Sequence, residues 1–469
     1  MIRKPLSKEK TFDWITLSVY ISLVIIGWFM VFSTLYDAND PYTFLDIRTQ
    51  IGAQTAWLIL SIFAFIATLT LDWKFWNTLA FPIYAVSIIF LILVIFVGKE
   101  INGAKSWFSF GFISFQPSEW AKVGTALALS SYLSFFKTSI TNTNTLAVSM
   151  ALFLTPALLI LLQPDFGSAL IFASFFILLY RRGLSSFIFV LGIGLAAIFI
   201  LSLMYGTYLV ATLLFALGVI ALILEREAGR RALFVVVMFM MIFVGSWFIE
   251  DQKFMILPPL LLFIFYSFLQ IKNTNFKLVG VLLPVIALSI LFSYTSSYTF
   301  DNFLRPHQQE RVNVWLRPEK CDPRGSLYNI TQSKLAIGSG GFYGKGYLKG
   351  QMTKLNYVPE QTTDFIFTSI GEEQGFIGSV GVIILFSILL IRCIIIAERA
   401  NLEFIRNYGY AVAGILFLHF AFNIGMTMGL MPVIGIPLPF ISKGGSSLMA
   451  FSVMVAILIK MDKARYRSN

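Results

Sequence analysis

Long runs of hydrophobic residues, separated by short polar or charged breaks, recur along the whole chain. About 20 apolar residues in a helix are enough to cross the hydrocarbon core of a bilayer. We therefore predict an all-α integral membrane protein, a polytopic bundle of about 14 transmembrane helices. The predicted spans lie near residues 14–35, 52–71, 76–97, 119–136, 146–162, 166–180, 187–204, 206–224, 232–249, 254–270, 278–296, 364–391, 408–430 and 440–460.

The composition agrees with residence in a membrane. Of the 469 residues, 57% are hydrophobic and 13% are charged, whereas about 25% are charged in ordinary soluble domains. The first apolar run is longer than the core of a signal peptide and lacks a small-residue cleavage site, so we expect it to remain as a span. The formal net charge of +11 follows the loops between spans, and we expect no nucleic-acid partner.

The distribution of basic residues predicts the orientation. If both termini are cytoplasmic, 20 of the 35 Lys and Arg residues lie in inner segments, and the short outer loops hold only Arg48, Lys99, Lys105 and Lys253. Short loops rich in Lys and Arg stay on the cytoplasmic side. We therefore expect cytoplasmic termini and a large extracytoplasmic loop over residues 297–363.

Ionisable residues inside or beside the spans are the first candidates for function, because charges in lipid are costly. Lys105 precedes the segment QPSEWAK, in which Glu119 and Lys122 are three residues apart on a predicted helix and can pair. This pair either fixes helix packing or lines a polar cavity. His419 lies mid-span among apolar residues, where we expect a hydrogen-bonded core position.

A second candidate follows a break between two apolar runs, in the segment QPDFGS. Asp165 comes directly after Pro164, where a carboxylate can cap the helix that follows. Its role is either this capping or contact with a substrate. The sequence alone leaves both open.

The segment 297–363 and the residues after it concentrate further polar groups. Asp322 precedes Pro323, and an Asp-Pro pair is by itself typical of a turn. A glycine-rich run with interspersed lysines follows, which can present N–H groups and ammonium charges to a diphosphate. Near residue 440 the backbone is rich in Gly, Pro and Ser, and such backbone persists at membrane depth only where protein or a wet cavity covers it. The candidates here are Arg317, Asp322, Lys334, Lys345, Glu360, Asp364, Ser446 and Ser447.

These motifs together resemble the SEDS family, which includes RodA, FtsW and SpoVE. Six blocks between residues 102 and 447 stand in the family's order. The block QSKLAIGSGG followed by GKG is more similar to the RodA branch. The blocks are NGAKSW with QPSEWAK, LLQPDFGSA, CDPRG, QSKLAIGSGGFYGKG, VPEQTTDFIFTSIGEEQGF and NIGMTMGLMPVIGIPLPFISKGGSS.

The resemblance implies a peptidoglycan glycosyltransferase that polymerises lipid II into glycan strands at the outer face of the bacterial cytoplasmic membrane, for cell elongation and rod shape. The family carries an essential aspartate in a DP pair of its large outer loop, which matches Asp322. The implied partners are lipid II, an undecaprenyl diphosphate-linked disaccharide peptide, a class B penicillin-binding protein and other elongation-complex proteins. No cofactor is required by the sequence, although Mg²⁺ or Mn²⁺ can assist at a diphosphate.

The resemblance also organises the chain into one SEDS-type domain over 1–469. The family usually has ten spans, so we expect about four additional helices, inserted over 206–296 before the catalytic loop 297–363. Lys443 stands where the family usually has a tyrosine.

The chemistry fits the residues of the loop. A sugar hydroxyl that attacks an anomeric carbon needs a proton acceptor, and a carboxylate such as Asp322 can serve as general base. The departing diphosphate needs positive charge. Two alternatives are a flippase or transporter for a lipid-linked precursor and a non-catalytic scaffold for the penicillin-binding protein.

Overall fold

The computed structural model describes residues 12–36, 46–101, 103–110, 113–135, 138–226, 256–272, 276–304, 306–322, 325–355 and 357–464. The chain divides into two compact units. Unit 1 combines Met1–Leu184 with Asp322–Asn469, and unit 2 is Ser185–Cys321.

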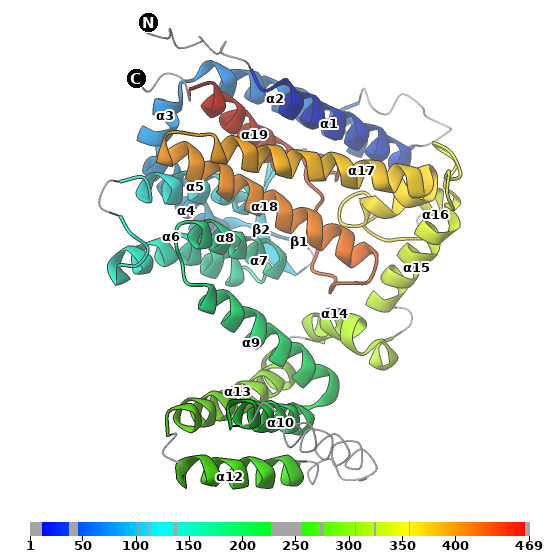
Figure 1. Cartoon of the computed structure of the whole chain (residues 1–469). Coiled ribbons are helices and arrows are strands. Elements are labelled where there is room, and N and C mark those ends of the chain that lie inside the picture. The colour runs from blue at the N-terminus through cyan, green and yellow to red at the C-terminus, as the bar shows by residue number, and fades with distance from the viewer. Residues whose placement is uncertain are drawn as a thin grey trace, which may run out of the picture. The chain divides into compact units, whose positions relative to one another are not determined.

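Unit 1 is a helical bundle (Figure 1). Side chains of Asp13, Thr49 and Asn142 accept hydrogen bonds from the first turns of the helices that follow them, which fixes where those helices begin. The helices are α1 (Trp14–Leu35), α2 (Gln50–Thr70), α3 (Trp73–Thr78), α4 (Ala80–Val97), α5 (Pro117–Tyr132), α6 (Thr143–Leu161), α7 (Phe166–Ile171), α8 (Phe175–Arg181), α15 (Ser326–Ser339), α16 (Gln351–Lys354), α17 (Ile366–Glu398), α18 (Glu403–Thr427) and α19 (Gly445–Ala464).

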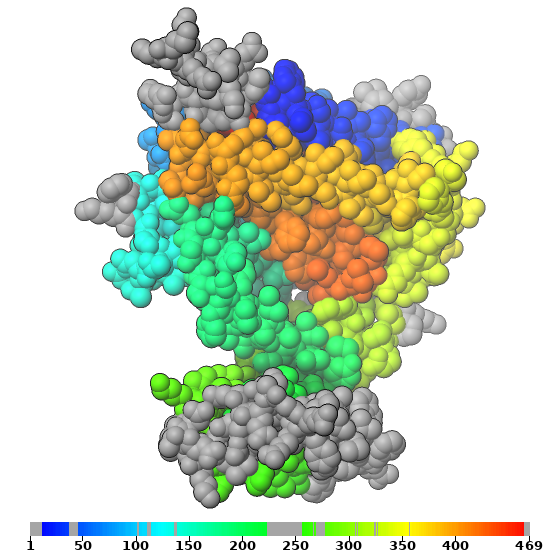
Figure 2. Space-filling model, viewed as in Figure 1, coloured from blue at the N-terminus to red at the C-terminus, as the bar shows by residue number. Residues whose placement is uncertain are grey.

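The core of unit 1 lies around α18 and α19. In their most apolar stretches, 72% and 78% of residues are buried, against 22% in α4. Helix α17 runs between α1 and α18, as Figures 1 and 2 show. The outer helices expose large apolar side chains such as Phe63 and Phe96. An exposed apolar surface of this kind is what a lipid environment covers.

A small antiparallel sheet connects α4 to α5. Its strands are β1 (Lys99–Ile101), β2 (Ala104–Phe110) and β3 (Ile113–Phe115), in the order β1-β2-β3. The rings of Phe108 and Phe115 lie edge-on against Phe90 of α4, which anchors the sheet to the bundle. This sheet was not predicted from the sequence, because three short strands outside the spans leave only a short alternating pattern.

Unit 2 consists of α9 (Ser186–Tyr205), α10 (Thr207–Arg226), α12 (Leu257–Lys272), α13 (Phe276–Phe303), α14 (Pro306–Leu316) and a 3₁₀ turn, η4 (Pro318–Lys320). One apolar cluster joins α10, α12 and α13 through Val219, Phe263 and Ile286. A Cβ at Gly218 would lie 2.7 Å from the Ile286 Cδ1 atom, so the absence of a side chain there lets α10 approach α13.

The predicted spans can be compared with these elements one by one. Helices cover thirteen of the fourteen predicted ranges, and the range 232–249 lies outside the described residues. Within the described ranges, nine helices are long and apolar enough to cross a membrane. Helix α5, which is shorter and carries charge, is not one of these nine. The count of fourteen therefore stays a prediction. The fold class, a polytopic helical membrane protein, is confirmed.

The predicted insertion and loop fall on structured elements. The range 206–296 lies within unit 2, which also contains α9 and α14. Helix α13 continues to Phe303, past the predicted loop boundary at 297, and most of the described remainder of 297–363 folds into α14, α15 and α16.

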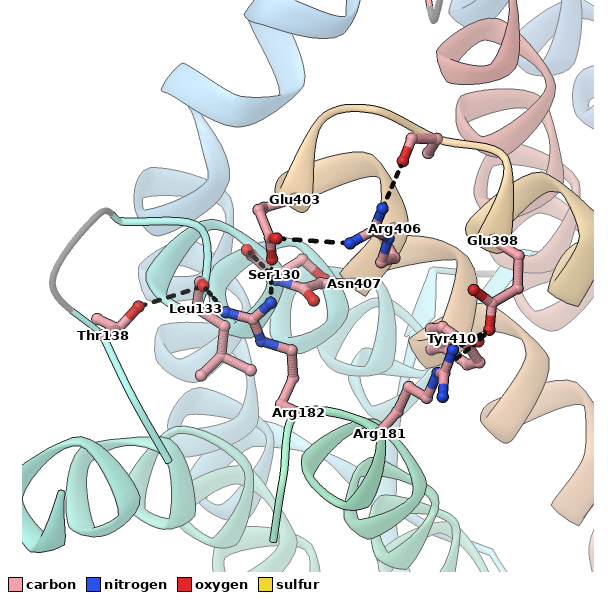
Figure 3. A network of polar contacts seen from close by, with 11 residues as sticks. Ser130, Leu133, Thr138, Arg181, Arg182, Glu398, Glu403, Arg406, Asn407 and Tyr410 are labelled. Atoms are coloured by element: carbon pink, nitrogen blue, oxygen red, sulfur yellow. Dashed lines mark hydrogen bonds and ion pairs between the residues drawn. The ribbon is translucent and has the colours of Figure 1, made fainter. Parts of the chain in front are cut away.

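Arginines gather at one end of unit 1, where α8, α17 and α18 meet (Figure 3). Arg181 pairs with Glu398, and its Nε donates to the Tyr410 hydroxyl over 2.9 Å. Arg182 pairs with Glu403 and donates to the carbonyl oxygen of Leu133, just past α5, over 2.9 Å. These contacts join four helix ends that the charge pattern assigns to the same side of the membrane.

A second ionic cluster at helix ends ties the start of α1 to the ends of α17 and α19. The buried Asp13 carboxylate accepts from Arg392 over 2.7 Å and from Arg399 over 2.8 Å. Arg399 also pairs with Asp462 over 2.6 Å. The beginning of the first helix and the end of the last therefore lie at the same end of unit 1.

This cluster predicts a pH-dependent stability. Burial acts to raise the pKa of Asp13, but hydrogen bonds from Thr16 N–H and Arg392, with the charges of Arg392 and Arg399, outweigh it and hold the pKa below its usual 3.8. The stabilisation is present above that usual value and is lost as pH falls through the lowered pKa. Asp13→Asn should cost about 2 kcal/mol at pH 7, as for a charged hydrogen bond.

Thermal melting of the detergent-solubilised protein measures this effect. The difference in melting temperature between wild type and Asp13→Asn should be constant from pH 7 to 5 and shrink below about pH 4. Asp46→Asn, at a loop carboxylate that accepts from the Arg48 N–H, serves as the matched control. A difference that grows on acidification would contradict the assignment.

Candidate active site

Lys122 lies in the interior of unit 1 with none of its side chain exposed. Its Nζ donates to Glu119 Oε1 over 2.9 Å and lies 2.8 Å from His419 Nε2 on α18. The ammonium also lies 5.2 Å from the centre of the Phe451 ring on α19. The predicted pair of Glu119 and Lys122 is confirmed, and it is extended to two further helices.

His419 connects this charge to irregular backbone. Its Nδ1 lies 3.0 Å from the carbonyl oxygen of Pro437. A carbonyl only accepts, so Nδ1 carries the proton and Nε2 accepts from the Lys122 ammonium. The predicted hydrogen-bonded core position of His419 is thus confirmed. Through it, α5 and α18 hold the segment between α18 and α19.

The two carboxylate oxygens of Glu119 differ in their contacts. Its Oε2 atom is buried and has no hydrogen-bond partner among the described residues. A buried carboxylate oxygen without a donor costs free energy, unless a water or a ligand supplies one. Glu119 therefore combines a packing role, through Lys122, with an acceptor oxygen to which no described residue donates. Both interpretations of the pair remain compatible with this geometry.

A polar cluster lies at the beginning of α5 and α7. We call it the Asp165 cluster and define it as Gln116, Ser118, Asp165, Ser168 and Ser446. Gln116 Nε2 donates to Asp165 Oδ2 over 3.2 Å, and Gln116 N–H donates to Ser446 Oγ over 3.3 Å. Ser118 Oγ lies 3.4 Å from Ser168 Oγ. Asp165 and Ser446, two predicted site residues far apart in sequence, are thus held by one glutamine.

Asp165 also caps α7 as predicted. Its Oδ1 accepts from the Ser168 N–H over 3.0 Å. The same carboxylate therefore uses one oxygen for the helix and the other for Gln116, which leaves it half-buried at the surface of the cluster.

Asp364 reaches the neighbourhood of the cluster through the segment between α18 and α19. A Cβ at Gly167 would lie 2.8 Å from the carbonyl oxygen of Ile434, so this segment passes directly over the start of α7. At the next residue, Gly435, a Cβ would lie 3.2 Å from Asp364 Oδ2. The φ of +77° at Gly435 favours glycine in any case.

Asn423 hydrogen-bonds the residues just before α17 to the segment between α18 and α19. Its Nδ2 donates to the carbonyl oxygens of Asp364 and Ile436, each over 2.8 Å. Ser442 Oγ accepts from Leu438 N–H over 2.8 Å and donates to the Thr363 carbonyl oxygen over 2.6 Å. The irregular backbone near residue 440 is therefore covered and hydrogen-bonded by protein, as the sequence predicted.

Lys345 is bound to a carboxylate of α17. Its Nζ donates to Glu372 Oε1 over 2.7 Å, and the same carboxylate accepts from the backbone N–H groups of Met352 and Thr353. Glu372 is fully buried. The loop between α15 and α17 is thus held by one ion pair and several hydrogen bonds, and the charge of Lys345 already has a partner.

The remaining predicted residues lie outside the Asp165 cluster. Lys105 is exposed in β2, opposite Glu100 in the sheet register. Lys334 is exposed on α15, and a Cβ at Gly429 would lie 2.6 Å from its Nζ, so it crosses the backbone just after α18. Ser447 Oγ donates to the Gly444 carbonyl oxygen over 3.0 Å.

Glu360 occupies a strained turn before α17. Its φ is +57°, a conformation that costs about 1–3 kcal/mol for a residue other than glycine. Its carbonyl oxygen accepts from the N–H groups of Thr363 and Phe365, and its Oε2 accepts from Thr363 Oγ1 over 3.0 Å. The turn thus presents an exposed carboxylate six residues before the start of α17 at Ile366.

Asp322 is exposed at the point where the chain enters unit 1 for the second time. Its carbonyl oxygen accepts from the Gly325 N–H over 3.1 Å. Arg317 belongs to unit 2. Within the described part of the chain, no group of three or more His, Cys, Asp or Glu side chains gathers to hold a metal ion.

The contacts that organise the site join residues far apart in the sequence. The link from Lys122 to His419 spans 297 residues, and no local pattern signals it. Gln116 and Asn423 lay in motifs that were noted, but their side chains were not singled out. Two amide side chains in or beside proline- or glycine-rich motifs were the available signal, since irregular backbone needs hydrogen-bond partners.

The exposed apolar surface of the outer helices, with nine helices among the described residues that are long and apolar enough to cross a membrane, defines an integral membrane protein. The family model FTSW_RODA_SPOVE, described as cell cycle protein, matches residues 13–216 and 204–467. The chain belongs to this family. The resemblance to SEDS proteins stated from the motifs is confirmed.

Individual relatives agree with the family. The chain is 30% identical to the peptidoglycan glycosyltransferase RodA of Treponema pallidum (strain Nichols), over 96% of this chain and 97% of that one. It is 28% identical to the peptidoglycan glycosyltransferase MrdB of Escherichia coli (strain K12), over 82% and 77%. A solved structure described as the structural coordination of polymerization and crosslinking by a peptidoglycan synthase complex is 26% identical, with a TM-score of 0.63 over 98% and 99%.

The buried network predicts a strongly asymmetric response to mutation. Lys122→Met leaves the Glu119 carboxylate buried without its cation, which should cost about 3–5 kcal/mol. The double variant Glu119→Gln with Lys122→Met removes both charges and should be less destabilised than Lys122→Met alone. Melting temperatures in detergent, arranged as a double-mutant cycle, measure the coupling. Additive effects of the two substitutions would contradict the pairing.

The two roles of Asp165 can be separated by its isostere. Asn is as good a helix cap as Asp, whereas Ala costs about 1 kcal/mol. Asp165→Asn should therefore melt near wild type, and Asp165→Ala should melt lower. Activity measured on Asp165→Asn then reports on the charge together with the second acceptor oxygen, which Gln116 Nε2 contacts. Equal melting of the Asn and Ala variants would show that the cap contributes nothing.

Proposed function

We propose that this chain joins lipid II molecules into glycan strands at the outer face of the bacterial cytoplasmic membrane, with both termini in the cytoplasm and Asp322 as the general base. The wider class is settled by family and relatives: the chain is a peptidoglycan glycosyltransferase of the RodA type. The substrate, the sidedness and the base are the parts that we propose.

The observation that carries the proposal is the polarity of α5. The Asp165 cluster lies at its beginning, at Gln116 and Ser118, and the arginine network contacts its end, through Arg182 and the Leu133 carbonyl. Sixteen helical residues separate the two ends, which is about 24 Å along a helix axis. If the basic end faces the cytoplasm, as basic ends do, the polar cluster faces outward.

This placement suits a membrane-anchored substrate. The undecaprenyl tail stays in lipid beside the apolar helices, and the sugars and peptide project on the outer side. The Asp165 cluster offers amide, hydroxyl and carboxylate groups that hydrogen-bond sugar hydroxyls. Asp364 adds an acceptor close by, because its Oδ2 contacts Gly435 of the segment that crosses the start of α7.

The reaction forms one glycosidic bond and breaks one bond to phosphate. The 4-hydroxyl of an acceptor sugar attacks the anomeric carbon of the donor, and undecaprenyl diphosphate leaves. The hydroxyl proton passes to a carboxylate, for which an exposed Asp322 is accessible to substrate. The departing diphosphate carries negative charge that Lys334, and the charge on Lys345 when released from Glu372, can stabilise.

A divalent cation fits this scheme only with the help of the substrate. Mg²⁺ commonly combines one or two carboxylates with substrate phosphates. Mg²⁺ or Mn²⁺ would therefore bind with the diphosphate beside a carboxylate such as Asp322.

The partner that we propose is a class B penicillin-binding protein, which crosslinks the new strands, together with other elongation proteins. Support comes from the structural neighbour whose description couples polymerization with crosslinking in one synthase complex. The exposed apolar faces of the outer helices provide surface within the membrane for such a partner.

Strand synthesis from labelled lipid II, by the purified full chain with its penicillin-binding protein, tests the base. Asp322→Ala and Asp322→Asn should each reduce the rate at least about 100-fold, because a general base contributes about 10²–10⁴. Glu319→Gln, at an exposed carboxylate three residues away, is the matched control and should stay within about twofold. Equal strand yields from wild type and Asp322→Ala would remove Asp322 from the mechanism.

The same preparation separates polymerase from flippase and scaffold. In vesicles with lipid II on one leaflet, a flippase moves the label across without making strands. A scaffold makes no strands and moves no lipid. Its only measurable property is binding to the partner, which Asp322→Ala should leave unchanged. The proposal requires strands that depend on Asp322.

A further inference from the structure

Unit 2 contains a large cavity that the proposed reaction does not use. Its volume is about 1180 Å³, and it is lined by residues of α9, α10, α12 and α13 and by Arg317, which follows α14. Pockets for drug-sized ligands are about 300–1,000 Å³. The cavity therefore suits a molecule larger than an ordinary small ligand.

The walls of the cavity are apolar over most of their area. Phe215 of α10, Phe263 of α12 and Ile286 of α13 line it and belong to the apolar cluster that holds these helices together. Ile264 of α12 and Leu291 of α13 also line it, and both side chains are exposed. Walls of this kind take hydrocarbon chains, which can enter sideways from lipid.

One end of the cavity carries two opposite charges. Asp301 of α13 is exposed and Arg317 is half-buried, and both line the cavity. Their neighbours Phe300 and Leu316 pack in one buried cluster, so the two charged residues lie in the same region. Gln309 Nε2 donates to the Phe300 carbonyl oxygen over 2.7 Å and fixes α14 to the end of α13.

A buried hydroxyl in the wall also lacks a partner. Ser267 of α12 lines the cavity, is 8% exposed, and its Oγ has no hydrogen-bond partner among the described residues. A buried hydroxyl without a partner is unfavourable, and an occupant or a water can satisfy it. Its presence in an otherwise apolar wall indicates a cavity that holds something in the working protein.

We propose that a zwitterionic phospholipid of the surrounding membrane occupies this cavity, with its chains between α10, α12 and α13, its phosphate on Arg317 and its ammonium on Asp301. The pair of charges selects this headgroup. Arg binds phosphate through two parallel hydrogen bonds, and a carboxylate binds an ammonium. A polyprenyl diphosphate or an anionic phospholipid carries only negative charge, which Asp301 would repel. This proposal does not depend on the glycosyltransferase activity.

Native mass spectrometry of the full chain in detergent tests the occupancy. Phosphatidylethanolamine, phosphatidylglycerol and undecaprenyl diphosphate are titrated separately. Phosphatidylethanolamine should saturate at one tightly bound molecule. Ala287→Phe, at an exposed residue that lines the cavity, should abolish this binding, whereas Val285→Phe, at an exposed residue of the same helix outside the lining, should retain it.

The charges are tested by the preference between lipids. Wild type should prefer phosphatidylethanolamine over phosphatidylglycerol by about tenfold, the effect of one charged hydrogen bond. Asp301→Asn should remove this preference, and Arg317→Gln should weaken both lipids. Equal binding of the two lipids by wild type, tighter binding of undecaprenyl diphosphate, or no loss in Ala287→Phe would each overturn the proposal.

Discussion

The contacts of the buried Lys122 ammonium with its acceptors are the interaction on which unit 1 depends. A buried cation in a bundle surrounded by lipid has no water to return to, so it must keep its acceptors. Glu119 supplies one from the same helix, and His419 supplies the other from α18. Because His419 in turn holds the Pro437 carbonyl, the position of the irregular segment before α19 is tied to one charge.

That segment places the polar groups of the site. It crosses the start of α7 at Gly167 and contacts Asp364 at Gly435. Asn423 donates both to this segment and to the Asp364 carbonyl oxygen just before α17. The Asp165 cluster therefore forms where three separate stretches of chain meet, at the end of α5 remote from the arginines. The packing of these helices therefore fixes the positions of the polar groups relative to one another.

Sequence patterns predicted the helices well because each span is one continuous apolar run, whether it is buried in the bundle or exposed on its outside. They also predicted the cap at Asp165, which is a local feature. They did not predict the contact of Lys122 with His419 or the sheet beside α4, since one depends on tertiary packing and the other on a few residues outside the spans. Arg317 and Asp322 stand five residues apart in sequence yet belong to different units.

Photo-crosslinking of lipid II tests the central claim, that the Asp165 cluster faces the outer leaflet and receives the sugars. Lipid II with a photoreactive group on its disaccharide would be added to the outer side of oriented vesicles that contain the full chain, and labelled peptides identified by mass spectrometry. The account predicts labels at the start of α5, at the start of α7 and in 428–446. Labels confined to the arginine-rich end, or to α9–α13, would contradict it.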